Sequence, residues 1–207
     1  MTELPDGKVV AAVVLAAGAS TRMGRNKLLL ELDGETLVRR AVRAAVDAGL
    51  GQVVVVLGHD EERVRAELGG LPCQIVVNAD YARGAGTSVH AGVRQAPDAD
   101  AVVIVLADMP LVTAAMIAAL AARYRATGAP LVVSHYGDED SRTQAPPTLF
   151  DRRLLAELLS IDDEQCGKRV VQNHRAEAEV VTWPASALRD VDLPGDYEAV
   201  RGDRPPR

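Results

Sequence analysis

The sequence predicts an α/β fold, a single-domain three-layer sandwich in which a mostly parallel β-sheet lies between two layers of helices. Short runs made almost entirely of Val, Ala, Leu and Ile recur along the chain, which is typical of parallel strands buried on both faces. Segments with apolar residues at helical spacing separate these runs. The length of 207 residues suits one domain with a full-sized core. Strands that alternate with helices in this way favour a parallel sheet covered on both faces.

The first half of the chain shows the alternation clearly. Residues 9–15 form a valine-rich apolar run before a glycine turn, so we expect the first strand there. Residues 36–48 carry apolar side chains at helical spacing, and Gly49 behind them is a typical helix stop. The same reasoning predicts a strand over 53–57, a short helix over 60–68, a strand over 74–77 and a helix that begins at Ser88 and reaches Arg94.

The second half keeps this rhythm at first and then changes. A fourth strand is expected over 101–106, and Thr113 can cap a helix that ends before Gly128. Later elements are a strand over 131–133, a stiff loop at Ala145-Pro146-Pro147, a helix over 151–159, a strand over 179–181 and a short helix opened by Pro194. The expected organisation is one domain over residues 1–200 and a flexible tail over 201–207.

Composition excludes several classes of protein. A formal net charge of -6 repels polyanions, so nucleic acid is not an expected partner. Two isolated cysteines and four scattered histidines suggest neither a disulfide framework nor a zinc site. The apolar run after residue 9 resembles a signal peptide, but Glu3 and Asp6 precede it with Lys8 as the one basic residue, whereas a secretory leader begins with positive charge. No run is long enough to cross a membrane, and we expect a cytoplasmic protein.

The segment after the first predicted strand is suited to binding phosphate. Its backbone begins with the small-residue stretch Leu15, Ala16, Ala17, Gly18, and then Arg22, Arg25 and Lys27 bring three positive charges close together. Small residues let backbone N–H groups approach phosphate oxygens, and the basic side chains neutralise the charge. The spacing fits neither a P-loop, because Arg25 follows Gly24, nor a dinucleotide fingerprint, because Ser20 replaces its second glycine. The structural alternative is a solvated basic loop.

Ligands of a Rossmann-like parallel sheet bind beyond the carboxyl ends of its strands. Chemistry is therefore expected just after Leu15, Leu57, Val77 and Leu106. Asp108 lies at the last of these positions, where a carboxylate without a partner is costly to bury. It could cap the following helix, but Thr113 is better placed to do so.

The pattern LAAG-x-S-x-RMG-x-x-K at residues 15–27 resembles the signature loop of the MobA/MocA-like nucleotidyltransferases, most closely the molybdenum cofactor cytidylyltransferases. The resemblance continues through Asn78-Ala79-Asp80-Tyr81, Gly84-Ala85-Gly86-Thr87-Ser88 and Leu106-Ala107-Asp108-Met109-Pro110, in the family's order. It implies a sheet of the nucleotide-diphospho-sugar transferase type. It also implies magnesium-dependent transfer of a nucleoside monophosphate from an NTP to a phosphorylated acceptor, with release of pyrophosphate.

The resemblance assigns roles to residues of this chain. Arg22, Lys27 and Asp108 become the catalytic groups, with Asp108 and Asp190 as ligands of Mg²⁺, or of Mn²⁺. The NTP is expected to contact residues 15–18, Arg22, Lys27, Asn78, Gly86 and Ser88. Structural alternatives remain for Ser88 as a helix N-cap, for Asn78 as a residue satisfied by backbone, and for the acidic segment at residues 190–196 as a helix start.

The acceptor half departs from the family's pattern. Ala145-Pro146-Pro147 replaces its Gly-His-Pro, and Gln165 stands where an Asp is usual. Arg169 and Asp192 are the expected acceptor contacts, because a guanidinium binds phosphate by a bidentate fork. Molybdopterin is the expected acceptor and a molybdoenzyme a possible client. The alternatives are another phosphorylated acceptor, such as a sugar or polyol phosphate, and a non-catalytic nucleotide-binding assembly factor.

The base is expected to be cytosine. The superfamily has two loop types: Leu-Ala-Ala-Gly resembles the cytidylyl type and Leu-Ala-Gly-Gly the guanylyl type. Residues 15–18 of this chain have the first sequence. The Cβ of Ala17 narrows the space for the base and favours a pyrimidine, although one methyl group discriminates by only about 1–3 kcal/mol.

Overall fold

A computed structural model describes residues 7–20, 23–138, 142–161, 165–189, 191 and 195–198. Within this part of the chain, seven strands form one sheet in the order β5-β4-β1-β6-β8-β7-β9. The strands are β1 (Val10–Ala16), β4 (Gln52–Leu57), β5 (Gln74–Val77), β6 (Ala101–Leu106), β7 (Leu131–Tyr136), β8 (Thr143–Asp151) and β9 (Ala178–Trp183). All neighbouring strands are parallel except for β8, which is antiparallel to both β6 and β7. The mostly parallel sheet predicted from the sequence is confirmed.

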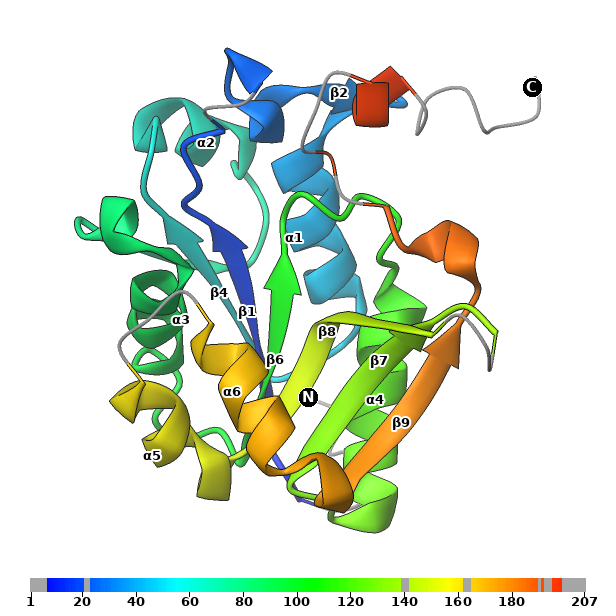
Figure 1. Ribbon diagram of the computed structural model, residues 1–207. Helices are drawn as coiled ribbons and strands as arrows, with labels where there is room; N and C mark the ends of the chain where they lie inside the picture. Colours follow the sequence, from blue (N-terminus) through cyan, green and yellow to red (C-terminus); the bar gives the residue numbers. More distant parts are fainter. Residues whose placement is uncertain are drawn as a thin grey trace.

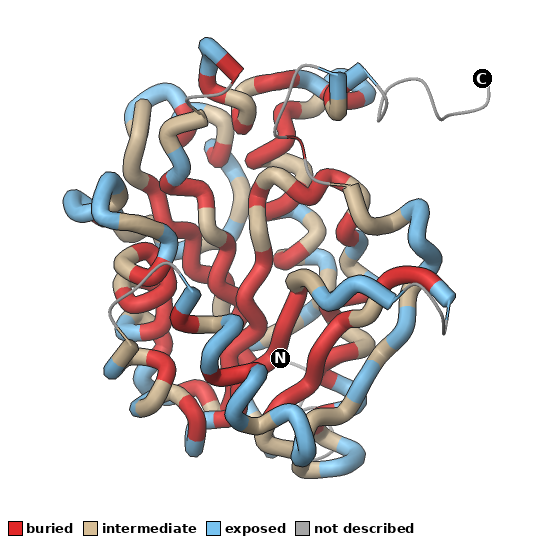
Figure 2. Tube along the Cα trace, in the orientation of Figure 1, coloured by how far each residue is buried: buried red, intermediate tan, exposed pale blue. Residues whose placement is uncertain are grey.

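Helices cover both faces of the sheet and complete three layers (Figure 1). The helices are α1 (Leu37–Asp47), α2 (Glu61–Glu67), α3 (Ala85–Val93), α4 (Ala114–Thr127), α5 (Arg152–Ser160) and α6 (Cys166–Asn173). Helices α1, α2 and α4 pack on one face, whereas α3, α5 and α6 pack on the other. Alternate residues of β1 belong to the two cores, with Val10, Ala12 and Val14 in one and Ala11 and Val13 in the other. The central strands are therefore buried on both sides, as their continuous apolar sequence requires (Figure 2).

Most predicted elements occur within one to three residues of their expected bounds. Thr113 caps α4 as predicted, since its side chain accepts a hydrogen bond from the Met116 amide, and Gly128 ends that helix in the left-handed conformation. Helix α6, the hairpin of β2 (Glu31–Leu32) with β3 (Glu35–Thr36), and several one-turn 3-10 helices were not expected. Pro194, the chain after residue 198 and the predicted tail lie outside the described residues.

The predicted stiff loop at Ala145-Pro146-Pro147 is wrong, because these residues belong to β8. Proline cannot donate a hydrogen bond to a strand ladder. The register shifts between Val133 and Ser134, so that the pairing with β7 steps over both prolines. The carbonyls of both prolines accept hydrogen bonds from side chains of β7: the Ser134 hydroxyl donates to the carbonyl of Pro147 at 2.7 Å, and the Tyr136 hydroxyl to that of Pro146 at 2.7 Å.

Among the described residues, no helix is both long enough and apolar enough to cross a bilayer.

Candidate active site

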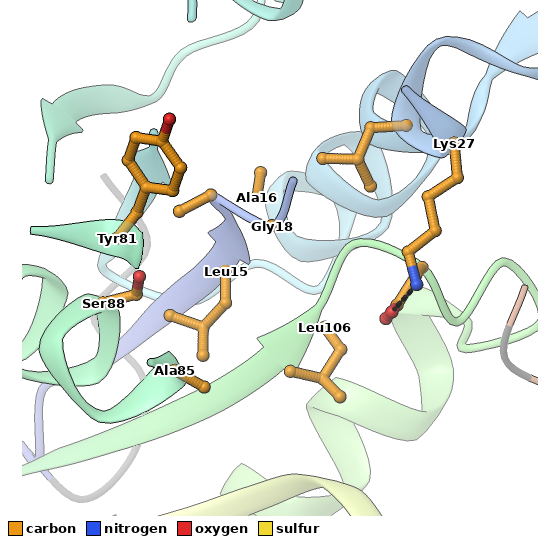
Figure 3. Close-up of a pocket in the computed structure, with 11 residues that line it drawn as sticks. Leu15, Ala16, Gly18, Lys27, Tyr81, Ala85, Ser88 and Leu106 are labelled. Atoms are coloured by element: carbon orange, nitrogen blue, oxygen red, sulfur yellow. Dashed lines mark hydrogen bonds and ion pairs between the residues drawn. The ribbon is translucent and has the colours of Figure 1, made fainter. Parts of the chain in front are cut away.

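A cavity of about 270 Å³ opens at the carboxyl ends of β1 and β6. Its lining comprises Leu15, Ala16, Ala17, Gly18, Lys27, Leu28, Tyr81, Ala85, Ser88, Leu106 and Asp108. Seven of these were named from the sequence, although they come from three separate stretches of the chain. The parallel sheet brings them together because the strands before these stretches end at one edge. Figure 3 shows Tyr81 and Ser88 on one side of the cavity and Lys27 on the other, with Leu15 between them.

The loop after β1 is held in shape by Ser20. This residue has a φ of 52°, in the left-handed region that residues with a side chain rarely occupy. Its hydroxyl accepts a hydrogen bond from the Lys27 amide at 3.1 Å, and its carbonyl accepts one from the Met23 amide at 3.0 Å. These bonds close the loop and fix the backbone that carries Lys27. Arg22, named as a catalytic and nucleotide-binding residue, lies outside the described residues.

Lys27 and Asp108 form an ion pair at one end of the cavity. The Lys27 Nζ lies 2.7 Å from Asp108 Oδ2, and the two side chains are 12% and 23% exposed. Asp108 follows β6 and is not a helix cap, since Thr113 performs that role for α4. The pair is therefore a cation and a carboxylate held together in the wall of a cavity, which is suited to contact with a charged ligand.

The C-terminal part of the chain reaches this pair. The Val191 amide donates a hydrogen bond to the Asp108 carbonyl at 3.0 Å, and Val191 is fully buried. Asp190 and Asp192, named for metal and acceptor binding, lie outside the described residues. Within the part of the chain that the structure describes, no group of three or more His, Cys, Asp or Glu side chains could hold a metal ion.

Tyr81 is a cavity residue that reasoning from the sequence did not select. A Cβ at Gly58 would lie 2.8 Å from the Tyr81 Cβ and 2.9 Å from the Ala17 Cβ, so only glycine allows these segments to approach so closely. The His59 ring packs against Tyr81 with its centroid 6.1 Å away. The signal in the sequence is an aromatic residue four positions after the predicted strand over 74–77, within the motif Asn78-Ala79-Asp80-Tyr81.

Of the expected nucleotide contacts Asn78, Gly86 and Ser88, only Ser88 lines the cavity. Asn78 lies beside Ser88. Helix α3 begins at Ala85, so Ser88 lies within it and the alternative that Ser88 is the N-cap is wrong. Ser88 lines the cavity, whereas Asn78 is buried behind it and donates a hydrogen bond to the Ser88 Oγ at 2.9 Å. Gly86 is buried in the first turn of α3 and is not among the lining residues.

A second cavity, of about 230 Å³, adjoins the first and shares Leu15, Ala85 and Leu106 with it. The rest of its wall is mainly apolar and consists of Val89, Ile104, Gln144, Ala145, Pro146, Thr148, Phe150, Leu158, Cys166, Gly167, Lys168 and Val171. The two atypical segments of the acceptor half therefore meet at one cavity, although they are far apart in sequence. Lys168 and Arg169 are both exposed, but Lys168 lines the cavity and Arg169 does not. Lys168 and Arg169 are neighbours on α6, a helix that was not predicted. Without the orientation of this helix, the sequence does not show which of the two residues faces the cavity.

Comparison with known proteins points to one family. The model of the MobA-like NTP transferase domain matches residues 12–179. The purine catabolism protein PucB of Bacillus subtilis is 32% identical over 200 residues, which cover 91% of this chain and 94% of PucB.

Other relatives are matched over less of their length. The nicotine blue oxidoreductase of Paenarthrobacter nicotinovorans is 40% identical over 110 residues, or 53% of this chain. The chain spans 52% of the length of that relative and 22% of the length of another curated relative.

A solved structure, that of Rv0371c from Mycobacterium tuberculosis in complex with manganese, is 25% identical. It has a TM-score of 0.79, covering 95% of this chain and all of that one.

Proposed function

The chain belongs to the MobA-like NTP transferase family, and we propose that it transfers CMP from CTP to the terminal phosphate of a molybdopterin-type acceptor. The single observation that carries this proposal is the cavity in which Lys27 and Asp108 meet beside the small-residue loop after β1. In the transfer, an oxygen of the acceptor phosphate forms a bond to the α-phosphorus of the NTP. The bond from that phosphorus to the bridging oxygen breaks, and pyrophosphate leaves with the electron pair.

The two ends of the cavity suggest how the NTP lies. Lys27 provides positive charge at one end, where it can hold the triphosphate, and residues 15–18 line the floor between the ends. Tyr81 and Ser88 at the other end provide an aromatic ring and a hydroxyl, which suit a nucleobase. The acceptor phosphate is already an anion, so no general base is required. Catalysis then depends on alignment and on charge neutralisation, to which Arg22 would also contribute.

The donor set at Asp108 fits a hard divalent cation. Mg²⁺ is usually bound by one or two carboxylates, with substrate phosphates and water as its other ligands. Asp108 supplies one carboxylate within the cavity, and we propose Asp190 as the second. A bound Mg²⁺ or Mn²⁺ would neutralise phosphate charge during transfer. The manganese complex of Rv0371c supports the use of a divalent ion of this kind.

The choice of CTP rests on Ala17. Its side chain lines the cavity beside Tyr81, and its methyl group reduces the room for a purine. One methyl group discriminates by about 1–3 kcal/mol, which a comparison of CTP with GTP measures.

The choice of acceptor rests on the second cavity. Its wall is dominated by aliphatic and aromatic side chains, with Gln144, Thr148 and Lys168 as polar groups. Sugar and polyol phosphates carry many hydroxyl groups, each of which would lose hydrogen bonds to water in such a pocket. A flat heterocycle buries apolar faces there, while Lys168 can pair with a phosphate. The purine catabolism relative PucB is in keeping with a client of the xanthine-oxidase type. We assign the acceptor contact to Lys168 rather than Arg169, together with Asp192.

An acceptor screen tests the proposal. Purified protein with Mg²⁺ is incubated with CTP, GTP, ATP or UTP and with molybdopterin, a sugar phosphate or a polyol phosphate, and pyrophosphate release is followed. We expect release with CTP and molybdopterin, and its loss in Asp108→Ala. Release with another acceptor but not with molybdopterin would favour the alternative of a sugar or polyol phosphate. Binding of NTP without release for any acceptor would indicate the non-catalytic assembly factor.

A further inference from the structure

The hydroxyl of Ser88 has one hydrogen available for a ligand. Ser88 is 4% exposed, lies in α3 and lines the cavity beside Tyr81. Its Oγ accepts a hydrogen bond from Asn78 Nδ2 at 2.9 Å, and it has no other side-chain partner among the described residues. A buried hydroxyl that accepts one bond and donates none is incompletely satisfied. Its unused donor is therefore available to the occupant of the cavity.

The orientation of the Asn78 amide follows from its other partners. Asn78 Oδ1 accepts a hydrogen bond from the Asp80 amide at 3.0 Å, which requires an oxygen at that position. Nδ2 then faces the hydroxyls of Thr87, at 2.8 Å, and Ser88. Thr87 uses its own hydrogen toward a carbonyl, Gly84 O at 2.9 Å or Asp80 O at 3.1 Å, so it can only accept from Asn78. Reversing the amide would lose the bonds with the Asp80 amide and the Thr87 hydroxyl, and only Ser88 could still pair with it.

Because both hydrogens of Nδ2 and the oxygen Oδ1 have partners within the protein, Asn78 has no donor left for a base. Asn78 is also 6% exposed and is held at the end of β5, where its backbone N–H donates to Leu57 O at 2.8 Å. The amide therefore acts through Ser88. It occupies the accepting side of that hydroxyl and leaves the hydrogen for the cavity.

We propose that Asn78 is a positioning residue that makes Ser88 a hydrogen-bond donor toward an acceptor atom on the edge of the nucleobase. This inference rests on the proposed function, because it requires a nucleotide with its base at the Tyr81 end of the cavity. Cytosine fits the polarity, since its carbonyl oxygen and the adjacent ring nitrogen both accept hydrogen bonds. A base edge that presents a donor at this point would face the donor of Ser88 and would be rejected.

The substitution Asn78→Asp tests the polarity with little change of shape. The carboxylate oxygen that replaces Nδ2 accepts the hydrogen of Ser88, so the hydroxyl turns its donor away from the cavity. We expect calorimetry to show CTP binding weakened about 10-fold or more, the scale for one buried hydrogen bond left unmade. Binding of inorganic triphosphate, which has no base, should change by less than about 2-fold. A general effect of the new negative charge would weaken both ligands.

Ser88→Ala and Thr87→Val complete the design. Ser88→Ala keeps a good helix former in α3 and should weaken CTP binding as much as Asn78→Asp does, again without affecting inorganic triphosphate. Thr87→Val removes the other hydroxyl partner of the same amide but leaves the bond to Ser88. It should lower the melting temperature and leave CTP affinity unchanged. In the Ser88→Ala background, Asn78→Asp should add less than about 2-fold, because the two residues act as one unit.

Several results would overturn the inference. One is unchanged CTP affinity in Ser88→Ala, a variant that decides the matter even if Asn78→Asp does not fold. Additive effects of Asn78→Asp and Ser88→Ala on CTP affinity would also overturn it. So would equal losses of affinity for CTP and inorganic triphosphate, or weaker CTP binding in Thr87→Val. Failure of the wild-type protein to bind any NTP would instead refute the proposed function.

Discussion

Lys27→Met should strengthen metal binding while it weakens nucleotide binding. Lys27 Nζ lies 2.7 Å from Asp108 Oδ2, so a metal ion that binds this carboxylate must compete with the ammonium group. A hydrogen bond between charged groups contributes about 1.5–3 kcal/mol. The Asp108 side chain is 23% exposed, and partial solvation favours the lower end of this range. At about 1.4 kcal/mol per factor of ten, Mn²⁺ affinity should rise about 10-fold.

The nucleotide responds in the opposite direction because Lys27 is proposed to hold the triphosphate. The loss of one electrostatic stabiliser costs about 2.7–4 kcal/mol in the transition state, so catalytic efficiency should fall by about 100- to 1,000-fold. Methionine keeps the length and the apolar stem of lysine, so the change is mainly one of charge. A general loss of structure would weaken the binding of both Mn²⁺ and nucleotide. A rise in Mn²⁺ affinity together with a fall in nucleotide affinity therefore identifies this mechanism.

The assay is a titration with Mn²⁺ without nucleotide, in which free Mn²⁺ is measured by electron paramagnetic resonance. CTP binding is measured separately by calorimetry. Lys168→Met is the matched control, because it makes the same change of charge in the second cavity and should leave Mn²⁺ affinity unchanged. Unchanged or weaker Mn²⁺ binding in Lys27→Met would refute the competition between lysine and metal. Full Mn²⁺ binding in Asp108→Asn would show that the carboxylate is not the ligand.

Gly92→Ala should destabilise the fold, because the new Cβ would lie 2.3 Å from Val13 Cγ1. Overpacking costs about 1–3 kcal/mol, so calorimetry should show a melting temperature lower by about 3–10 °C. An unchanged melting temperature would contradict this close packing. Tyr81→Leu should weaken CTP binding about 5-fold or more, the lower end for loss of base stacking, without affecting inorganic triphosphate; equal losses would place the base elsewhere. The pKa of His174 is raised, first by its hydrogen bond to Glu157. Its stabilising effect is present below the unfolded pKa of about 6.5 and is lost as pH rises through the folded value. His174→Gln should therefore lower the melting temperature at about pH 6 more than at about pH 9, and equal shifts would exclude the protonated pair.

The sequence alone was sufficient for the parallel core and for the charged end of the cavity. Continuous apolar runs identify β1, β4 and β6, because a strand covered on both faces has no polar positions. Capping residues located α4, since Thr113 and Gly128 act on their immediate neighbours. Lys27 and Asp108 are identifiable from the segments that follow β1 and β6, without knowledge of their contact. These signals are local: each depends on residues a few positions apart.

Contacts between residues far apart in the sequence could be learned only from the tertiary structure. It placed Lys27 against Asp108 and brought Gly58, Ala17 and Tyr81 so close together that a side chain at Gly58 has no room. It also paired the Asn78 amide with Asp80, Thr87 and Ser88, and the direction of the bond to Ser88 follows from the other partners of that amide. Asp190 and Asp192 remain predictions from the sequence.

The acceptor half shows the same limit most clearly. The prolines of β8 lie in a strand because a register shift leaves them out of the ladder with β7, and the hydroxyls of Ser134 and Tyr136 donate to their carbonyls. Lys168 lines the second cavity, whereas Arg169 does not, because successive residues of a helix point in different directions. The sequence determines which groups are available and which local elements they join. The packing of those elements determines which groups meet, since it depends on the shapes and hydrogen-bond partners of side chains far apart in the chain.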